Sequence, residues 1–167
     1  SQLADLICTL DCSHTLRVAI DGVDASGQTT LADELVPLIE RKGRLVIRGS
    51  VDGFHNPREV RYHRGADSPK GYYLDSFNYE TLQRDLLIPL GPGGNRKYRR
   101  AAFDFREDAT TPEVWCEALV EEILLFDGVF LLRPKLIHHW DFSIFVDVDF
   151  DISVSRALVR DVAQSGG

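Results

Sequence analysis

Hydrophobic residues in the first third of the chain switch between short continuous runs and helical spacing. Residues 17–21 form a short, mostly apolar run, which predicts a buried strand leading into a glycine-rich loop. Apolar residues then recur at helical spacing over residues 31–39, and Gly43 is placed to end that helix. The run RLVIRGS, residues 44–50, predicts a second strand. Strand, loop, helix and strand in this order are typical of a βαβ unit in a parallel sheet.

The rest of the chain continues the alternation. Residues 51–76 are rich in Gly, Pro, Asp, Arg, His and Tyr with little periodicity, which predicts a functional loop region. Helical spacing resumes over residues 78–90 and is expected to stop at Pro89. Further expected segments are a helix over 3–10, a turn-rich connection over 91–100 and a helix over 151–163. Strands are expected over 101–105, in 121–132 with Asp127-Gly128 at the C-terminal end, and over 141–150. The pattern predicts a three-layer α/β/α sandwich with a mainly parallel sheet, as a single domain over residues 1–167, with ligands at the carboxyl ends of the strands.

Composition narrows the functional classes. Of 167 residues, 44% are hydrophobic and 27% charged, the balance of a globular domain. No apolar run approaches the roughly 20 residues of a membrane span, and the N-terminus lacks signal-peptide character, so a cytoplasmic protein is expected. A net charge of −7 argues against binding a nucleic-acid polymer, although basic clusters over 58–70 and 96–100 leave sites for small anions. The three cysteines lack metal-ligand spacing, so neither a disulfide framework nor a zinc site is expected.

The segment GVDASGQTT, residues 22–30, has the spacing of a phosphate-binding loop, G-x-x-x-x-G-K-S/T, with Gln28 in place of the lysine. In such a loop, backbone N–H groups and the helix N-terminus face the phosphates, and Thr29 is placed to put its hydroxyl on Mg²⁺. Gln28 donates only neutral hydrogen bonds, and charge-assisted ones are roughly twice as strong. Losing one preorganised donor typically costs about 10²–10³ in rate, so nucleotide binding is more secure than turnover. The residues expected to hold the nucleotide here are Gly22, Val23, Asp24, Ala25, Ser26, Gly27, Gln28, Thr29 and Thr30.

Aspartates stand at or just past the ends of three predicted strands, at positions 21, 52 and 127. The motifs around them are ordered: the glycine loop is followed by DGFH, YYLDSFNYETL, AFDF, LLFDGVFLL and VSRALVRD. This order resembles the uridine kinase family of P-loop kinases and its pantothenate kinase and phosphoribulokinase relatives, and the likeness spans residues 17–162.

The resemblance implies roles for particular residues. Asp52 matches the family's acceptor-activating carboxylate, and Asp127 matches an acidic residue that supports Mg²⁺ through water; Thr29, Asp52 and Asp127 are therefore the expected metal residues. Arg156 and Arg160 match the lid arginines that clamp the ATP phosphates, and their four-residue separation puts both on one helix face. The family pattern continues past Gly167 with a last helix and strand, so a C-terminal part is expected to be missing here.

The resemblance also suggests the acceptor side. Residues expected to contact the acceptor are Asp52, Phe54, His55, Arg58, Tyr98, Asp104 and Arg106, with Tyr72 and Tyr73 as further candidates; core packing is an equally good interpretation of the aromatic ones. The implied function is an ATP- and Mg²⁺-dependent kinase that phosphorylates a hydroxyl of a small molecule, a nucleoside such as uridine, with Asp52, Gln28 and Arg160 as the catalytic residues. Pantothenate or a sugar as acceptor, a non-catalytic nucleotide-binding protein and, last, a nucleotide hydrolase stay open, as does a homo-oligomer.

Overall fold

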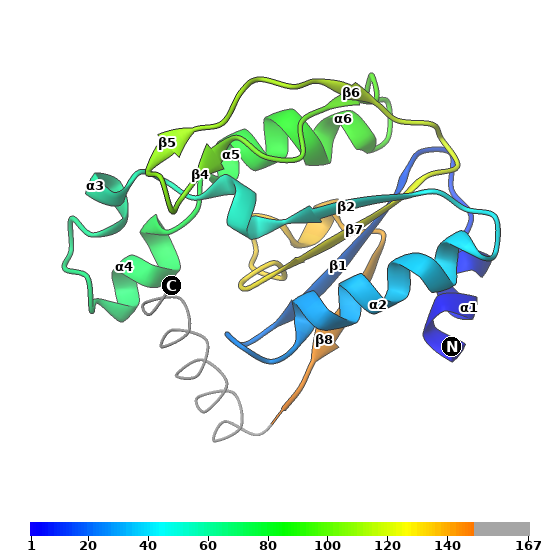
Figure 1. The fold of residues 1–167 in the computed structure, drawn as a ribbon, viewed down its shortest axis with the longest axis horizontal. Helices are drawn as coiled ribbons and strands as arrows, with labels where there is room; N and C mark the ends of the chain where they lie inside the picture. The colour runs from blue at the N-terminus through cyan, green and yellow to red at the C-terminus, as the bar shows by residue number, and fades with distance from the viewer. Residues whose placement is uncertain (149–167) are drawn as a thin grey trace.

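In the part of the chain that the structure describes, four parallel strands form the central sheet, in the order β2–β7–β1–β8 (Figure 1). The computed structural model describes residues 1–148. The strands are β1 Leu16–Gly22, β2 Val46–Ser50, β7 Ile123–Gly128 and β8 Phe142–Val146. Asp21 near the end of β1 pairs with Gly128 of β7 on one side and with Phe145 of β8 on the other. The strands therefore end together at one edge of the sheet, where ligands bind in open parallel sheets.

Helices cover both faces of this sheet. Helices α1 Gln2–Thr9 and α2 Gln28–Glu40 lie on one face, and α5 Tyr79–Leu82, the π-helical turn η2 Gln83–Leu87 and α6 Ile88–Leu90 lie on the other (Figure 1). Side chains of β7 alternate between the two interfaces, because successive residues of a strand point to opposite faces. Leu125 packs with the α1–α2 layer, whereas Leu124 and Phe126 pack with the α5–α6 layer. The predicted three-layer α/β/α class is confirmed.

The remaining elements are short and gather around the α5–α6 layer and the carboxyl ends of the strands. They are η1 Val51–Phe54, α3 Arg58–Arg61, α4 Pro69–Asp75, η3 Ile137–His139, and the antiparallel pairs β3 Lys97–Tyr98 with β6 Cys116–Glu117 and β4 Phe103–Asp104 with β5 Ala109–Thr110. Between residues 1 and 148, no helix combines the length and the apolar character that crossing a membrane requires.

Several predicted elements differ from the observed ones. The expected loop region over 51–76 contains three short helical segments, because local caps define them without any long periodicity: Ser68 accepts a hydrogen bond from the Gly71 N–H, and Pro69 occupies the first turn of α4. The helix expected over 78–90 is confirmed, but its centre widens into a π-turn and it runs one residue past Pro89.

The first strand, expected over 17–21, is confirmed and extends from Leu16 to Gly22, whereas several other predicted strands are longer than the observed ones. For the strand expected in residues 121–132, the predicted C-terminal end at Asp127-Gly128 is confirmed, and Phe130 beyond it has a left-handed backbone with φ of 60°. Of the strand expected over 101–105, Phe103–Asp104 forms strand β4, which pairs with β5. The helix expected over 151–163 lies outside the described residues.

Candidate active site

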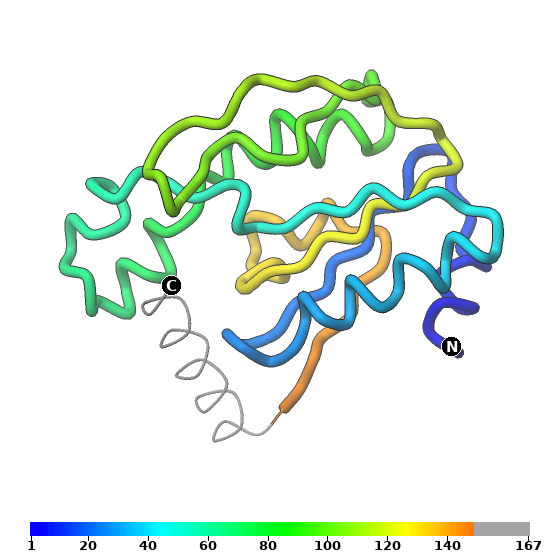
Figure 2. The backbone as a smooth tube through the Cα atoms, in the orientation of Figure 1, coloured from blue at the N-terminus to red at the C-terminus, as the bar shows by residue number. Residues whose placement is uncertain are grey.

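The glycine loop joins the end of β1 to the start of α2, as predicted (Figure 2). A Cβ atom on Gly22 would lie 2.2 Å from Ser26 Oγ, so the tight return of the loop requires glycine there. Gly27 has a φ of 99° and immediately precedes α2, a conformation that favours glycine. The first turn of α2, with its unpaired N–H groups and positive dipole end, therefore borders the loop.

Gln28 is folded back onto the loop. Its side-chain Oε1 accepts a hydrogen bond of 2.6 Å from Ser26 Oγ, and its Nε2 donates to the Val23 carbonyl oxygen at 3.3 Å. The residue is 7% exposed. The Gln28 amide thus helps to close the loop on itself, and it brings no charge to the position where the motif has a lysine.

Thr29 and Asp127 meet at the first turn of α2. Thr29 Oγ1 donates a hydrogen bond of 2.6 Å to Asp127 Oδ2, and Asp127 lies near the end of β7 with 2% exposure. The other carboxylate oxygen, Oδ1, accepts a bond of 2.6 Å from Arg48 Nη1. Hydroxyl and carboxylate oxygens are the ligands that Mg²⁺ prefers, so this pair fits the ion that the motif implies.

Asp52 stands opposite, just after β2. It lies in η1, where Ser50 Oγ accepts a bond of 3.2 Å from the Asp52 N–H. A cleft of about 740 Å³ joins the loop, Asp52 and Asp127. Its walls are residues 24–31, Glu34, Val51, Asp52, His55, Tyr72, Phe77, Phe105, Arg106 and residues 127–129. One cleft is therefore lined by the glycine loop, by the carboxylate residues Asp52 and Asp127, and by a group of aromatic residues, called the aromatic chamber below.

The aromatic chamber is built around His55. The ring of His55 lies between Phe77 and Phe105, with centroid separations of 4.7 and 4.5 Å. Its Nδ1 lies 2.9 Å from the Asp52 carbonyl oxygen, which requires the proton on Nδ1 for a hydrogen bond. Burial lowers the pKa of His55, so the ring is neutral at pH 7. The guanidinium of Arg106 covers the ring of Phe105 at 5.4 Å.

Other residues that the sequence suggested for the acceptor lie elsewhere. Phe54 and Tyr98 are buried in the core of the α5–α6 layer. Asp104 accepts hydrogen bonds from the N–H groups of the turn that follows it, and the Arg58 N–H donates to Asp108 Oδ1 at 2.7 Å. Of the residues considered, His55, Tyr72 and Arg106 line the cleft together with Asp52. The expected lid residues Arg156 and Arg160 lie outside the described residues.

Asp21, the third aspartate at a strand end, makes hydrogen bonds to the protein backbone. Its carboxylate accepts hydrogen bonds from the N–H groups of Gly22 at 2.7 Å and Leu132 at 3.0 Å. Burial raises the pKa of Asp21, and these N–H groups offset part of that rise. Asp21 therefore ties the segment after β7 to the end of β1.

Sequence reasoning missed three residues at the site. Phe77 and Phe105 form the walls of the aromatic chamber, and only the fold brings them to His55. Arg48 lies inside the strand predicted over residues 44–50, a prediction that rests on the apolar residues of that segment. The signal that could have identified it was a charged residue within a mostly apolar run.

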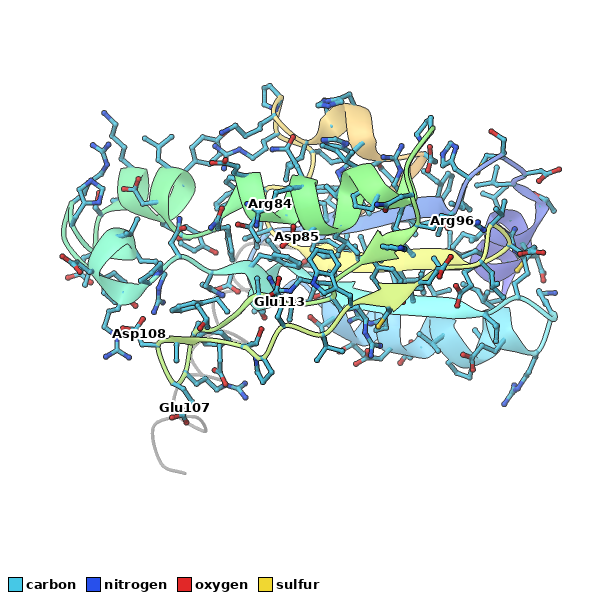
Figure 3. All side chains as sticks on the ribbon, turned by 90° about the horizontal axis from the view of Figure 1, so that it is seen from above. Arg84, Asp85, Arg96, Glu107, Asp108 and Glu113 are labelled. Carbon is cyan, nitrogen blue, oxygen red and sulfur yellow. The ribbon has the colours of Figure 1, made fainter. Side chains whose placement is uncertain are left out.

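A second cavity, of about 410 Å³, lies beyond His55 and Phe54. Arg84, Arg99 and Glu113 line it, and the buried Asp85 pairs with Arg84 at 2.8 Å and Arg99 at 3.4 Å. Figure 3 shows Arg84, Asp85 and Glu113 gathered near α5, with Glu107 and Asp108 displaced toward α3. His55 borders both cavities.

The parallel sheet, the glycine loop and the Thr29–Asp127 pair define a P-loop protein of the kinase type. The comparison with protein families makes this specific: residues 18–167 match the phosphoribulokinase / uridine kinase family, and the chain belongs to that family of ATP-dependent phosphotransferases.

Individual relatives are distant. The chain is 27% identical over 154 residues to uridine-cytidine kinase B of Dictyostelium discoideum, covering 92% of this chain and 61% of that protein. It is 24% identical to a uridine kinase of Oceanobacillus iheyensis, covering 89% of this chain and 69% of the relative. The chain thus spans roughly two thirds of the length of these relatives.

Two solved structures share the fold. One is that of a possible uridine kinase from Bacillus stearothermophilus, with a TM-score of 0.77 at 23% identity over 93% of this chain and 81% of the other. The second is a Silicibacter sp. TM1040 kinase whose name refers to fructose transport, with a TM-score of 0.77 at 24% identity over 97% and 82%.

Proposed function

We propose that this chain is an ATP- and Mg²⁺-dependent kinase that transfers the γ-phosphoryl group of ATP to a hydroxyl of a small molecule. The observation that carries the proposal is the single cleft that joins the glycine loop and the Thr29–Asp127 pair to the carboxylate of Asp52. Phosphoryl transfer needs mainly positioning and charge stabilisation, with one carboxylate near the attacking oxygen. The family and its uridine kinase relatives support this function.

Each part of the cleft has a task in this proposal. The backbone N–H groups of the loop and of the first turn of α2 bind the phosphates. Thr29 and Asp127 would hold Mg²⁺, which when bound would offset the charge of the phosphates. Asp52 accepts the proton of the acceptor hydroxyl as its oxygen bonds to the γ-phosphorus; the bond from that phosphorus to the bridging oxygen breaks, and ADP leaves.

The acceptor that best suits the chamber is a molecule with a planar ring, and a nucleoside such as uridine has one beside its free hydroxyls. The rings of His55, Phe77 and Phe105 offer faces and edges for stacking, and the neutral His55 has a hydrogen-bonding edge. Pantothenate or a sugar would use the polar residues of the cleft but would leave these aromatic surfaces without a planar partner.

One observation favours a second candidate, a protein that binds nucleotide without turning it over. The amide of Gln28 supplies no charge to the phosphates, and it is engaged within the loop: Oε1 accepts a bond from Ser26, and Nε2 donates one of its two hydrogens to Val23. Binding through backbone N–H groups and Mg²⁺ is compatible with this arrangement, whereas stabilisation of the transition state is weakened.

The deciding experiment measures ADP release from Mg-ATP with nucleosides, pantothenate and sugars, using the native chain, Gln28→Lys and Asp52→Asn. A kinase gives acceptor-dependent turnover in the native chain, and Asp52→Asn lowers it by about 10²–10⁴-fold while Mg-ADP binding persists. Turnover only in Gln28→Lys identifies the nucleotide-binding protein instead. Release of ADP that is independent of every acceptor contradicts the kinase proposal.

A further inference from the structure

Arg48 places a positive charge at the phosphate end of the cleft. It lies in the middle of β2, two residues after Val46, which packs with the α1–α2 layer, so both side chains lie on the face of the sheet that α2 covers. From there its guanidinium reaches the carboxyl end of the sheet: Nη1 contacts Asp127 Oδ1 at 2.6 Å and also donates to the Gly49 carbonyl oxygen.

Helix α2 fixes the direction of this side chain. Arg48 Nε donates to Asp33 Oδ1 at 3.0 Å. Asp33 is four residues after Thr29, so the two lie one turn apart on the same face of α2. Thr29 Oγ1 and Arg48 Nη1 bind the two different oxygens of the Asp127 carboxylate. Arg48 is therefore held between the first two turns of α2 and the end of β7, and its side chain is only 22% exposed.

The charges around the cleft make this position significant. The acidic residues that line the cleft are Asp24, Glu34, Asp52 and Asp127. Among the described residues of the lining, the one arginine is Arg106, which lies beside the aromatic chamber. Triphosphate adds further negative charge beside Asp127. At position 28, where the motif has a lysine, the described structure has a neutral amide bonded within the loop.

Resting on the kinase function proposed above, we propose that Arg48 is a positioning residue that supplies, through Asp127, positive charge which a lysine at position 28 would otherwise bring. By pairing with Oδ1 it offsets the repulsion between that carboxylate and the phosphates, and it keeps Oδ2 directed toward Thr29, the residue with which Asp127 would hold Mg²⁺. Charge-assisted hydrogen bonds make the pair strong enough to fix this orientation. A site that lacks the P-loop lysine depends on Arg48 more than a site that has it.

The test is a double-mutant cycle between positions 48 and 28, with Mg-ADP affinity measured by calorimetry and acceptor-dependent turnover measured alongside. In the native background, Arg48→Gln is expected to weaken Mg-ADP binding about 10-fold or more, and Arg48→Lys to retain most of the affinity because it keeps the charge. In the Gln28→Lys background, the same Arg48→Gln change is expected to cost less than about 3-fold, since the lysine supplies charge independently. Arg44→Gln is the matched control, because Arg44 lies two residues before β2, away from the carboxyl end of that strand, and donates hydrogen bonds to the carbonyl oxygens of Leu10 and Glu121.

Other outcomes overturn the inference. Equal losses from Arg48→Gln in both backgrounds mean a purely structural role, and tighter Mg-ADP binding in Arg48→Gln means that the guanidinium competes with Mg²⁺ for Asp127. If Arg48→Gln does not fold, Asp33→Asn, which removes the partner of Arg48 Nε, takes its place in the cycle, and an effect of Asp33→Asn that is equal in both backgrounds again contradicts the inference. If the native chain binds Mg-ADP and Arg48→Gln leaves that affinity unchanged, this inference alone is refuted. If neither the native chain nor Gln28→Lys binds Mg-ADP, the proposed function is refuted as well.

Discussion

Gly128 shows how one residue without a side chain sets the spacing between Asp52 and Asp127, two carboxylate residues that line the cleft. It follows Asp127 at the end of β7, and a Cβ atom there would lie 2.5 Å from Val51 Cγ1. Val51 immediately precedes Asp52, so the close approach of β7 to η1 sets the position of Asp52 relative to Asp127.

Gly128→Ala is expected to displace Val51 and Asp52 while leaving the glycine loop in place. The expected result is a loss of acceptor-dependent turnover of about 10-fold or more with Mg-ADP affinity changed by less than about 3-fold, because misplacing a reacting group costs rate more than binding. Steady-state kinetics and calorimetry on the same preparation provide the check. Equal losses of affinity and turnover would show that the added methyl disturbs the whole cleft.

At the residue scale, sequence motifs located the loop and the aspartates but not what their side chains contact. The spacing of Gly22, Gly27 and Thr29 required a particular turn, and the structure has it. The contacts of Gln28 within the loop could not be predicted, because a glutamine can direct its amide to solvent, ligand or backbone with similar ease.

The edge strand β8 is attached to β1 at the opposite end of the sheet from the cleft. Asp141, just before β8, accepts bonds from Arg17 N at 2.8 Å and Arg17 Nε at 3.2 Å, and its other oxygen lies 3.0 Å from His14 Nε2. Burial acts to raise the pKa of Asp141, but the bonds from Arg17 and His14 outweigh it and lower that pKa. Arg17 is 5% exposed and also donates to the Leu87 carbonyl oxygen, so it joins β8, β1 and η2.

Asp141→Asn is expected to lower the free energy of unfolding by about 2 kcal/mol, because it leaves the buried Arg17 guanidinium without its counter-charge. For a chain of this size the corresponding fall in Tm is roughly 5 °C. Chemical denaturation measures the change. The control is Asp11→Asn, because Asp11 is an exposed aspartate in the segment that precedes β1. A change below about 0.5 kcal/mol would show that the pair contributes little.

Segment η3 contains a histidine that titrates at low pH. His139 is 7% exposed, and its Nε2 lies 2.9 Å from Gln83 Oε1 of η2, an acceptor for the neutral ring's proton. Burial chiefly, with the neighbouring charges of His138 and Arg17, lowers the pKa of His139 to about 4. The folded protein therefore resists protonation of a ring that the unfolded chain protonates near pH 6.5.

This difference predicts that stability falls on acidification between about pH 6.5 and pH 4, because the unfolded state binds the additional proton in that window. Partial access of water to the ring reduces the effect to about 1–2 kcal/mol. The measurement is the free energy of unfolding at pH 7 and pH 4.5 for the native chain and for His139→Gln. The variant should lose less stability than the native chain over this interval, and identical losses would contradict the assignment.

At the scale of the whole molecule, the cleft is assembled from segments that are distant in sequence. The loop after β1, Asp52 after β2 and Asp127 of β7 meet because three parallel strands end at one edge. Beneath them, Phe126 of β7 packs against Phe54 of η1 at 6.3 Å and against Trp140 at 5.7 Å. The core of the α5–α6 layer therefore supports the segment that holds Asp52.

Because the site spans several elements, a ligand that fills it should stabilise the whole domain. Mg-ADP at about 100 times its Kd is expected to add about 2.7 kcal/mol and to raise the Tm by roughly 5–10 °C. Removing Mg²⁺ with a chelator, or replacing Thr29 by Val, should abolish most of the shift because Thr29 and Asp127 are the expected holders of the ion. A shift that is the same with and without Mg²⁺ would contradict the metal assignment; Mg²⁺ without nucleotide is the control.

The sequence by itself determined the βαβ start, the position of the phosphate-binding loop and the three strand-end aspartates, because glycine requirements and hydrophobic periodicity act over a few residues. Only the tertiary structure decided that Asp21 is structural whereas Asp52 and Asp127 face the cleft, that Phe77 and Phe105 enclose His55, and that Arg48 reaches Asp127. These facts depend on which strands become neighbours and on where each one ends. The order and the lengths of the strands are decided when two helical layers pack on one sheet. That packing involves residues far apart in the sequence, so it cannot be predicted from any short segment.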